Sequence, residues 1–596
     1  MIKSKSLKSV VSIVLALVFV ISSPFAALAC TSLYLGRDTT EHGTTIWGRN
    51  EDIWHLYSKL FTVVPAQSHE PGTYYESSTG FKWPYPAETL RYTVTPDSIY
   101  NEGVTPQPYG AVGMNEKNVS ITATTSLSPA HLGIRTADPF ISVKNGGLAE
   151  VDLPTPVLMQ ATSARDAVEL LAEIIDTVGN AERNGIMISD PNELWYMETL
   201  AGHQYVAVKA PSDKIAFSPN ITMMGAVDVT DTENVIASEG LIETAREAGT
   251  LVEDANGHII VAESYAVQRY NARLYQGYKY LIGEDAANSL DPAGYYEYFI
   301  DPRPEGKYTL YEAMRFMACP AIGHRNTVQS HMFETRHDMP EDLATVLWLA
   351  MGPAEFSIFL PSYGNLITET FENYTAYDSP RTNPDYNSMY WLFHDIFTLS
   401  SGDRNNVAPG VAEFLELYQK SLIEQQRVID EKIAAIYAKD PELAQQAATE
   451  LHLAIAEQAF EIMTLLRNEI MDYNQDPDPD KGVYTPSVKL PSITVESRNI
   501  NLNSNGIVTV TLRSSDDFDA AAVDPETVYF AGAAPVRWQV RGNGDVHFQF
   551  KTQELEISCT KFRATLSGET VDGEAFWATE LLDVLSPMRQ VSQRSR

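Results

Sequence analysis

The sequence predicts an α+β fold over most of its length, followed by a small all-β domain. Three observations support this. Short strands with antiparallel neighbours mix with amphipathic helices, which is the α+β pattern. A strongly helical stretch covers residues 409–473. A Pro- and Asp-rich linker over 474–486 then precedes strands that are joined by Asn-Gly turns. We therefore expect a main domain over 30–473 and an accessory β-sandwich over 487–596.

Residues 1–29 have the organisation of a secretory signal peptide. A lysine-rich start precedes a twelve-residue apolar core, Val10–Ile21, and small residues follow it. Ala27 and Ala29 occupy the two positions that signal peptidase reads, so cleavage after Ala29 would leave Cys30 as residue one. The alternative is a lipoprotein acylated at Cys30, but such signals usually have leucine where this chain has Ala27. We expect a secreted, periplasmic or cell-surface protein with an unmodified Cys30.

The charge of the chain restricts its partners. The formal net charge is -35, and removal of the signal would take away three lysines and no acids. Such acidity disfavours nucleic acid and anionic membranes as partners. No later stretch approaches the ~20 continuous apolar residues of a membrane-spanning helix, so we expect no stable membrane insertion. Whether the chain forms a homo-oligomer stays open.

The first elements after the signal form a β-hairpin. Polar and apolar residues alternate over Thr31–Leu35, which predicts one strand. Polar residues around Thr39–Gly43 form the turn, and Thr44–Trp47 form the second strand. The next predicted elements are strands within Tyr109–Ser126, a helix over Ser163–Gly179 with Ser163 as its N-cap, and a meander of three short strands over 184–210.

Two helices and a β-sandwich complete the chain. Lys439-Asp440-Pro441 divides the helical stretch into an amphipathic pair that we expect to pack on the preceding domain. After the linker, hairpins with turns at Asn505-Gly506 and Asn543-Gly544 indicate an immunoglobulin-like sandwich. It holds no cluster of catalytic residue types, so its role is expected to be accessory.

The chain has only three cysteines, which is sparse for an exported protein. Cys319 and Cys559 could pair, but one bridge is not a disulfide framework, and we expect both to be ordinary buried residues. The terminal position of Cys30 indicates a chemical role instead.

A cysteine at the start of a chain combines a thiol nucleophile with a free α-amine whose pKa of about 8 lets it accept a proton. This combination serves acyl transfer, in which the sulfur attacks an amide carbonyl and water then clears the thioester. The site also needs a cation, a carboxylate and oxyanion donors. "WGRNED" places Arg49, Asn50 and Asp52 at the end of the second strand, beside Cys30 if the hairpin pairs as predicted. The alternative for this string is a solvated loop.

Several segments together resemble a known family, the N-terminal-nucleophile (Ntn) cysteine dipeptidases, also called dipeptidase A-like peptidases. The segments are "CTSLYLG", "GTTIWGRNED", "YGAVGMNEKNVSI", "MISDPNELWYMET", "DLATVLWLAMGPAEFSIFLPSYG" and "SMYWLFHDI". The related choloylglycine hydrolases and penicillin V acylases share the Cys-Thr start and the Gly-Arg-Asn-x-Asp string. The resemblance covers roughly residues 30–473 and implies an αββα sandwich, two antiparallel sheets between helical layers.

The resemblance also implies roles for single residues. Cys30 matches the nucleophile, Arg49 the arginine beside it, and Asp52 the carboxylate that binds the α-amine. Asn220, in "FSPNITMMG", matches an asparagine of the oxyanion hole. Arg273, in "QRYNARLYQ", matches a later arginine near the nucleophile, with Arg269 as the alternative one turn away. The second oxyanion donor would come from around Thr125, where the acylases have Asn or Tyr.

Other chemistries find less support. His324, His331 and His337 could suggest a metal site, but the chain has no His-Glu-x-x-His and no cysteine pairs at zinc spacing. We interpret these histidines as scattered along a loop. No Gly-x-Ser-x-Gly elbow and no Walker-type loop occurs, which argues against serine hydrolases and nucleotide-binding proteins.

The sequence therefore predicts an exported cysteine-type dipeptidase that cleaves dipeptides or short peptides through Cys30, without metal or organic cofactor. One alternative is an acylase acting on a non-peptide amide. The other is a surface lipoprotein, acylated at Cys30, that binds ligands without catalysis.

Overall fold

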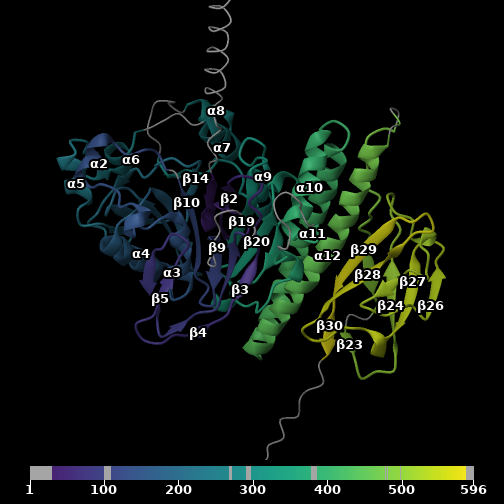
Figure 1. Ribbon diagram of the computed structural model, residues 1–596. Coiled ribbons are helices and arrows are strands. Elements are labelled where there is room, and N and C mark those ends of the chain that lie inside the picture. Colours follow the sequence, from purple (N-terminus) through teal and green to yellow (C-terminus); the bar gives the residue numbers. More distant parts are fainter. Residues whose placement is uncertain are drawn as a thin grey trace, which may run out of the picture.

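The structure is a computed structural model that describes residues 30–98, 109–125, 127–267, 272–289, 297–376, 386–476, 478, 481–496 and 499–585. Figure 1 shows sheets and helices mixed through the first part of the chain, and strands at its end. The expected α+β content is confirmed. The predicted signal peptide and Arg269 lie outside the described residues.

The first sheet contains the N-terminal hairpin at its centre. Its strand order is β18-β14-β1-β2-β19-β20-β21, and every neighbouring pair is antiparallel. The predicted hairpin is confirmed, with Thr31 opposite Asn50 and Leu35 opposite Ile46. The strands are β1 (Thr31–Leu35), β2 (Thr45–Asp52), β14 (Ile215–Ser218), β18 (Phe299–Ile300), β19 (Thr327–Thr335), β20 (Thr345–Met351) and β21 (Leu360–Ser362).

The second sheet is also antiparallel, with strand order β16-β13-β12-β11-β10-β9-β8-β3. It contains the predicted three-stranded meander as β11, β12 and β13. The strands are β3 (Thr62–Val64), β8 (Tyr92–Pro96), β9 (Gly110–Asn115), β10 (Ser120–Thr125), β11 (Asn184–Ser189), β12 (Leu194–Thr199), β13 (Tyr205–Lys209) and β16 (Val235–Ala237).

The two sheets share one apolar core. Met187 of β11 belongs to the core that includes Leu33 and Trp47 of the first sheet. Ile186 and Ile188, its neighbours in the strand, belong instead to a second core with α4. Because side chains alternate along a strand, β11 has one face toward the first sheet and the other toward the helices.

Helices cover the outer faces of both sheets (Figure 1). On the second sheet these are α3 (Pro154–Leu158) and α4 (Ala164–Val178), and Ser163 caps α4 by accepting from the Asp166 N–H, as predicted. The first sheet contacts α7 (Ala272–Ile282), α9 (Leu310–Ala318) and α10 (Met389–Gly402).

Short elements connect these layers. They are β4 (Gln67–Ser68), β5 (Tyr74–Glu76), β6 (Lys82–Pro84), β7 (Glu88–Thr89), α2 (Leu132–Ala137), β15 (Ala226–Val227), α5 (Leu241–Glu247), β17 (Ile259–Ile260), α6 (Val261–Tyr265) and α8 (Glu284–Asn288).

Two long helices follow, α11 (Ala408–Tyr437) and α12 (Pro441–Gln475). Asp440 caps α12 by accepting from the Leu443 N–H, and Pro441 occupies the first turn, where its missing N–H removes no hydrogen bond. Both helices lie between α10 and the C-terminal strands (Figure 1).

The C-terminal strands form small sheets around a core of their own. Their orders are β22-β24-β27-β26, β25-β28-β29 and β23-β30. The strands are β22 (Ile493–Val495), β23 (Asn499–Asn501), β24 (Ile507–Leu512), β25 (Tyr529–Phe530), β26 (Arg537–Val540), β27 (Val546–Lys551), β28 (Arg563–Glu569), β29 (Ala575–Leu581) and β30 (Asp583–Leu585).

Of the two predicted C-terminal hairpins, one is confirmed and the other is confirmed only in part. The hairpin around Asn543-Gly544 is present as β26 and β27, and Gly544 takes the positive φ of 88° that the turn requires. Asn505-Gly506, in contrast, does not join a tight hairpin. The first part of the predicted strand, β22, does pair antiparallel with β24, but the part directly before the turn, β23, pairs in parallel with β30.

The other cysteines also differ from expectation. Cys319 and Cys559 are both unpaired and partly exposed rather than buried. In the described part of the chain, no helix is long and apolar enough to cross a membrane.

Candidate active site

Cys30 lies directly before β1, at the centre of the first sheet, and is buried with 4% of its surface exposed. In the pairing with β2, Thr31 is opposite Asn50, and in the pairing with β14, Ser32 is opposite Ser218. Continuing both registers past the start of β1 brings Cys30 beside the end of β2 on one side and beside the segment after β14 on the other. The Asp52 backbone N–H donates to Cys30 Sγ at 3.4 Å.

The Asp52 carboxylate is held by three side chains. Thr327 Oγ1 donates to its Oδ1 at 2.6 Å, while Arg273 Nη1 and His324 Nε2 lie 3.2 Å and 3.5 Å from its Oδ2. Burial raises the pKa of Asp52, and the charges of His324 and Arg273 oppose that shift. Burial also lowers the pKa of His324, which the Asp52 carboxylate partly offsets.

Arg273 connects this carboxylate to the nucleophile. Besides Asp52, its Nη1 donates to the Cys30 carbonyl oxygen at 3.3 Å and to Thr31 Oγ1 at 2.9 Å. The side chain comes from the start of α7, which packs on β14. One guanidinium thus ties the beginning of β1 to the end of β2.

Arg49 faces the second sheet and is fully buried. Its Nη1 donates to Thr122 Oγ1 of β10 at 3.3 Å, and its Nη2 lies 3.6 Å from Glu150 Oε1. Tyr109 OH donates to the same Glu150 oxygen at 2.5 Å. Burial raises the pKa of Glu150 to about 7, against the opposing charge of Arg49.

These groups set the protonation of the thiol. Burial raises the pKa of Cys30 to about 12; the charge of Arg49 lowers it, while those of Glu150 and Asp52 add to the rise. With the Cys30 nitrogen in a peptide bond to residue 29, the thiol is therefore protonated near neutral pH. One cation, Arg49, does not compensate for burial.

Asn220 follows β14 and has two unusual properties. Its φ of 62° is in the left-handed region, which asparagine tolerates better than most residues. Although only 8% exposed, it has no hydrogen-bond partner for Oδ1 or Nδ2 among the described residues. An unsatisfied buried amide costs about 1–3 kcal/mol, so such a group in a native structure calls for a partner that arrives from outside.

A carboxylate of the second sheet holds the turn that carries Asn220. Glu198 Oε1 accepts from the Met223 backbone N–H and from Tyr196 OH, both at 3.0 Å. Burial raises the pKa of Glu198 to about 6, and the Met223 hydrogen bond opposes the shift. The two sheets thus jointly position this turn.

Two residues named in the sequence analysis remain, Asn50 and Thr125. Asn50 is structural, since its Nδ2 donates to the Met317 carbonyl oxygen of α9 at 2.9 Å. Thr125 ends β10 opposite Asn184, and its side chain lies outside what the structure describes.

The three histidines do not share a loop, which corrects the sequence interpretation. His331 is buried in β19 opposite Arg49, and His337 bonds Thr45 at 2.9 Å. His324 is the one that reaches Asp52. Across the described ranges, no group of three or more His, Cys, Asp or Glu side chains is arranged to hold a metal ion.

Sequence reasoning missed the partners that complete the site. Thr122 of β10 and Glu150 of a short 3-10 helix contact Arg49, and Tyr109 binds Glu150. Thr327 binds Asp52 from β19. No local motif marks them. The one available signal is that a buried arginine is normally paired with an anion, so a carboxylate near Arg49 could have been expected, but its position in the sequence could not.

Comparisons with known proteins show which family the chain belongs to. The model of peptidase family C69 matches residues 29–281 and 293–416. The "Probable dipeptidase B" of Streptococcus pyogenes serotype M1 is 32% identical over 79% of this chain and 98% of its own length. The "Probable dipeptidase" of Latilactobacillus sakei is 30% identical over 68% of this chain and 87% of its own length, and that of Salmonella dublin is 27% identical over 56% and 81%. The chain belongs to peptidase family C69.

Proposed function

We propose that this protein is an exported cysteine dipeptidase, in which Cys30 becomes the N-terminal residue and hydrolyses dipeptides or short peptides through a thioester. The observation that carries the proposal is the surroundings of Cys30 Sγ. The Asp52 backbone N–H donates to the sulfur, so the Asp52 carboxylate is also near Cys30. The Asn220 amide, which has no hydrogen-bond partner among the described residues, follows β14, the strand that pairs with β1.

The thiol pKa supports a free N-terminus. With residues 1–29 attached, the Cys30 nitrogen is an uncharged amide, and burial keeps the thiol pKa at about 12. Cleavage after Ala29 would create an α-ammonium group on Cys30 itself. An additional cation this close to the sulfur favours the thiolate, so cleavage would activate the nucleophile.

In the proposed reaction, the α-amine takes the thiol proton and the thiolate attacks the peptide carbonyl carbon. Asn220 Nδ2 donates to the resulting oxyanion. As the C–N bond breaks, the α-ammonium returns the proton to the leaving nitrogen, which departs as an amine. The α-amine of Cys30 then takes a proton from water, and the resulting hydroxide attacks the thioester carbonyl carbon. The C–S bond breaks, and the α-ammonium returns its proton to the departing sulfur, which leaves the acid and the Cys30 thiol.

The architecture fits the same proposal. Two antiparallel sheets with a shared core and helices on both outer faces are what an αββα Ntn hydrolase requires. We assign residues 1–29 to the signal peptide, 30–473 to the hydrolase domain with its helical pair, 474–486 to a linker and 487–596 to an immunoglobulin-like accessory domain.

A substrate panel tests the proposal. The mature protein should release amino acids from unprotected dipeptides, and Cys30→Ala should abolish release while keeping the fold. Cys319→Ala is the matched control, because it removes a partly exposed thiol outside the site and should keep full activity.

Two results would contradict the proposal. Cleavage of penicillin V or other acyl amides, with no action on dipeptides, would favour an acylase. A diacylglyceryl-modified Cys30 without hydrolysis of either class would favour a ligand-binding lipoprotein.

A further inference from the structure

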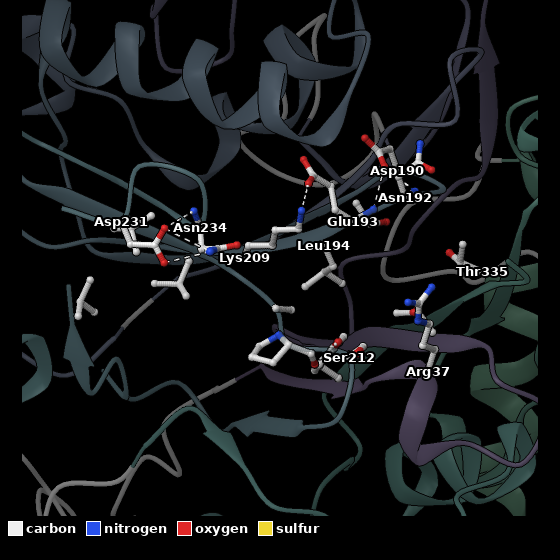
Figure 2. A pocket seen from close by; sticks show the side chains of 18 of the residues that line it. Arg37, Asp190, Asn192, Glu193, Leu194, Lys209, Ser212, Asp231, Asn234 and Thr335 are labelled. Atoms are coloured by element: carbon white, nitrogen blue, oxygen red, sulfur yellow. Dashed lines mark hydrogen bonds and ion pairs between the residues drawn. The ribbon is translucent and has the colours of Figure 1, made fainter. Parts of the chain in front are cut away.

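A cavity of about 640 Å³ is lined by residues of both sheets (Figure 2). The first sheet contributes Tyr34, Thr45 and Thr335 to its wall, and Arg37 follows β1. The second sheet contributes Ser189 and the turn after it. The volume is within the range of small-molecule sites, about 300–1,000 Å³.

This cavity is separate from the surroundings of the nucleophile. Tyr34 is four residues along β1 from Cys30, which corresponds to roughly 13 Å at ~3.3 Å per residue. Tyr34 is opposite Trp47 of β2, and Trp47 stacks on Phe333 at 4.5 Å between ring centroids, so buried aromatic rings back this end of the sheet. A ligand in the cavity would not touch Cys30.

Three polar groups on its wall lack partners. Ser189 is 2% exposed, and its Oγ has no hydrogen bond within the described part of the structure. It shares the face of β11 that Met187 presents to the first sheet. The Arg37 guanidinium and the Asn192 side-chain amide are exposed to solvent and make no hydrogen bond or ion pair with any described residue, and Figure 2 shows both at the same end of the cavity.

Two charged groups of the wall are already engaged. Asp190 accepts from the backbone N–H groups of Ala164, Asn192 and Glu193. Lys209 pairs with Glu193 at 2.6 Å. Arg37 is therefore the available cation, and an arginine fork suits a carboxylate.

The opposite end of the cavity is acidic. Figure 2 shows Asp231 with its partner Asn234 across the cavity from Arg37. Asp228 lies beside Asp231, since its carbonyl oxygen accepts from the Asp231 N–H, and its carboxylate accepts from Thr230 Oγ1. In total the wall has four carboxylates against two cations, Arg37 and Lys209. A simple anion would be repelled, whereas a molecule with an anionic and a cationic end would match both ends.

We propose that this cavity is a second binding site for a zwitterionic amino acid or short peptide. The ligand carboxylate binds Arg37, Asn192 and Ser189, and its ammonium group faces Asp228 and Asp231. The inference goes beyond the proposed hydrolysis and does not depend on it. Because the wall is acidic overall, ligands with an additional basic side chain bind more tightly.

Calorimetric titration of the full chain carrying Cys30→Ala tests this site without turnover. Alanyl-alanine and lysyl-alanine are the probes. Alanyl-alanine amide, which lacks the carboxylate, and N-acetyl-alanyl-alanine, which lacks the ammonium group, are the analogues. Adding Arg37→Ala should weaken one binding event at least tenfold for the unmodified dipeptides, and Ser189→Ala should weaken the same event less. Arg537→Ala, an exposed arginine of β26, is the matched control and should change nothing.

The analogues make the result specific. The amide should lose this event in the parent, and Arg37→Ala should cause no further loss for the amide. Retention of every binding event in Arg37→Ala, or a loss that Arg537→Ala reproduces, would overturn the proposal. Failure of the hydrolase proposal looks different, since dipeptides would then bind only the site that depends on Arg37.

Discussion

Replacing Glu150 by glutamine tests the buried charge network behind Cys30. Glu150 lies 3.6 Å from Arg49 and accepts a hydrogen bond from Tyr109, yet burial raises its pKa from 4.5 to about 7. A carboxyl whose pKa is raised on folding stabilises the protein below its unfolded pKa. That stability is lost as the pH rises through the folded pKa, because the native state must then hold a buried anion.

The magnitude follows from the two pKa values. One pKa unit corresponds to about 1.4 kcal/mol, so ionisation of Glu150 removes about 3 kcal/mol from the free energy of unfolding by pH 8.5. Glutamine resembles the protonated form and does not ionise. Relative to the wild type, Glu150→Gln should therefore gain stability as the pH rises, by about 2 kcal/mol between pH 5.5 and 8.5.

Urea unfolding at several pH values measures this difference. The matched control is Glu413→Gln, which changes an exposed carboxyl on α11 and should follow the wild type throughout. Parallel stability curves for Glu150→Gln and the wild type would refute the reasoning, since they would mean that Glu150 ionises in the folded protein as it does in the unfolded chain.

Two further substitutions test the reacting groups. Asn220→Gly keeps the left-handed backbone but removes the side-chain amide, so kcat should fall about a hundredfold. Asn118→Gly changes the other buried asparagine with a left-handed backbone (φ 61°) and should keep a near-normal kcat. Equal losses of kcat in the two variants would contradict an oxyanion role for Asn220. Thr327→Val removes the 2.6 Å hydrogen bond to the Asp52 carboxylate, and the loss of this bond raises the pKa of Asp52 further. We therefore expect kcat/KM to fall about tenfold, and the acidic limb of the pH profile of kcat/KM to move to higher pH. Thr335→Val, at the other end of β19, loses a similar hydroxyl contact with Thr345 and should leave the pH profile unchanged; an unshifted limb in Thr327→Val would argue against Asp52 as a titrating group.

Local patterns predicted the parts of the site that lie close in sequence. Cys30, Arg49 and Asp52 come together because one hairpin connects them, and alternation together with the turn sets its register. Asn220 and Arg273 are far along the chain, and only the family resemblance indicated them. The structure brings Arg273 to Cys30 and Asp52, and it places Asn220 after the strand beside β1.

Contacts between the sheets could not be predicted in this way. Thr122 meets Arg49 because the two sheets stack, and Glu150 reaches Arg49 from a short 3-10 helix about a hundred residues later. No spacing in the sequence encodes either contact. The same reason explains why Asn505-Gly506 does not form the predicted tight turn between β23 and β24. The turn residues were suitable, but β23 pairs with β30, some eighty residues later, and a long-range pairing overrides local turn propensity.

The central claim is that Cys30 acts as a free N-terminal residue. Intact-mass measurement and N-terminal sequencing of the active, exported protein test it most directly. We predict an unmodified Cys30 as residue one, and loss of activity when a single residue is left before it, because the base would then be an amide. Full activity in protein whose Cys30 is internal or carries a diacylglyceryl group would contradict the account.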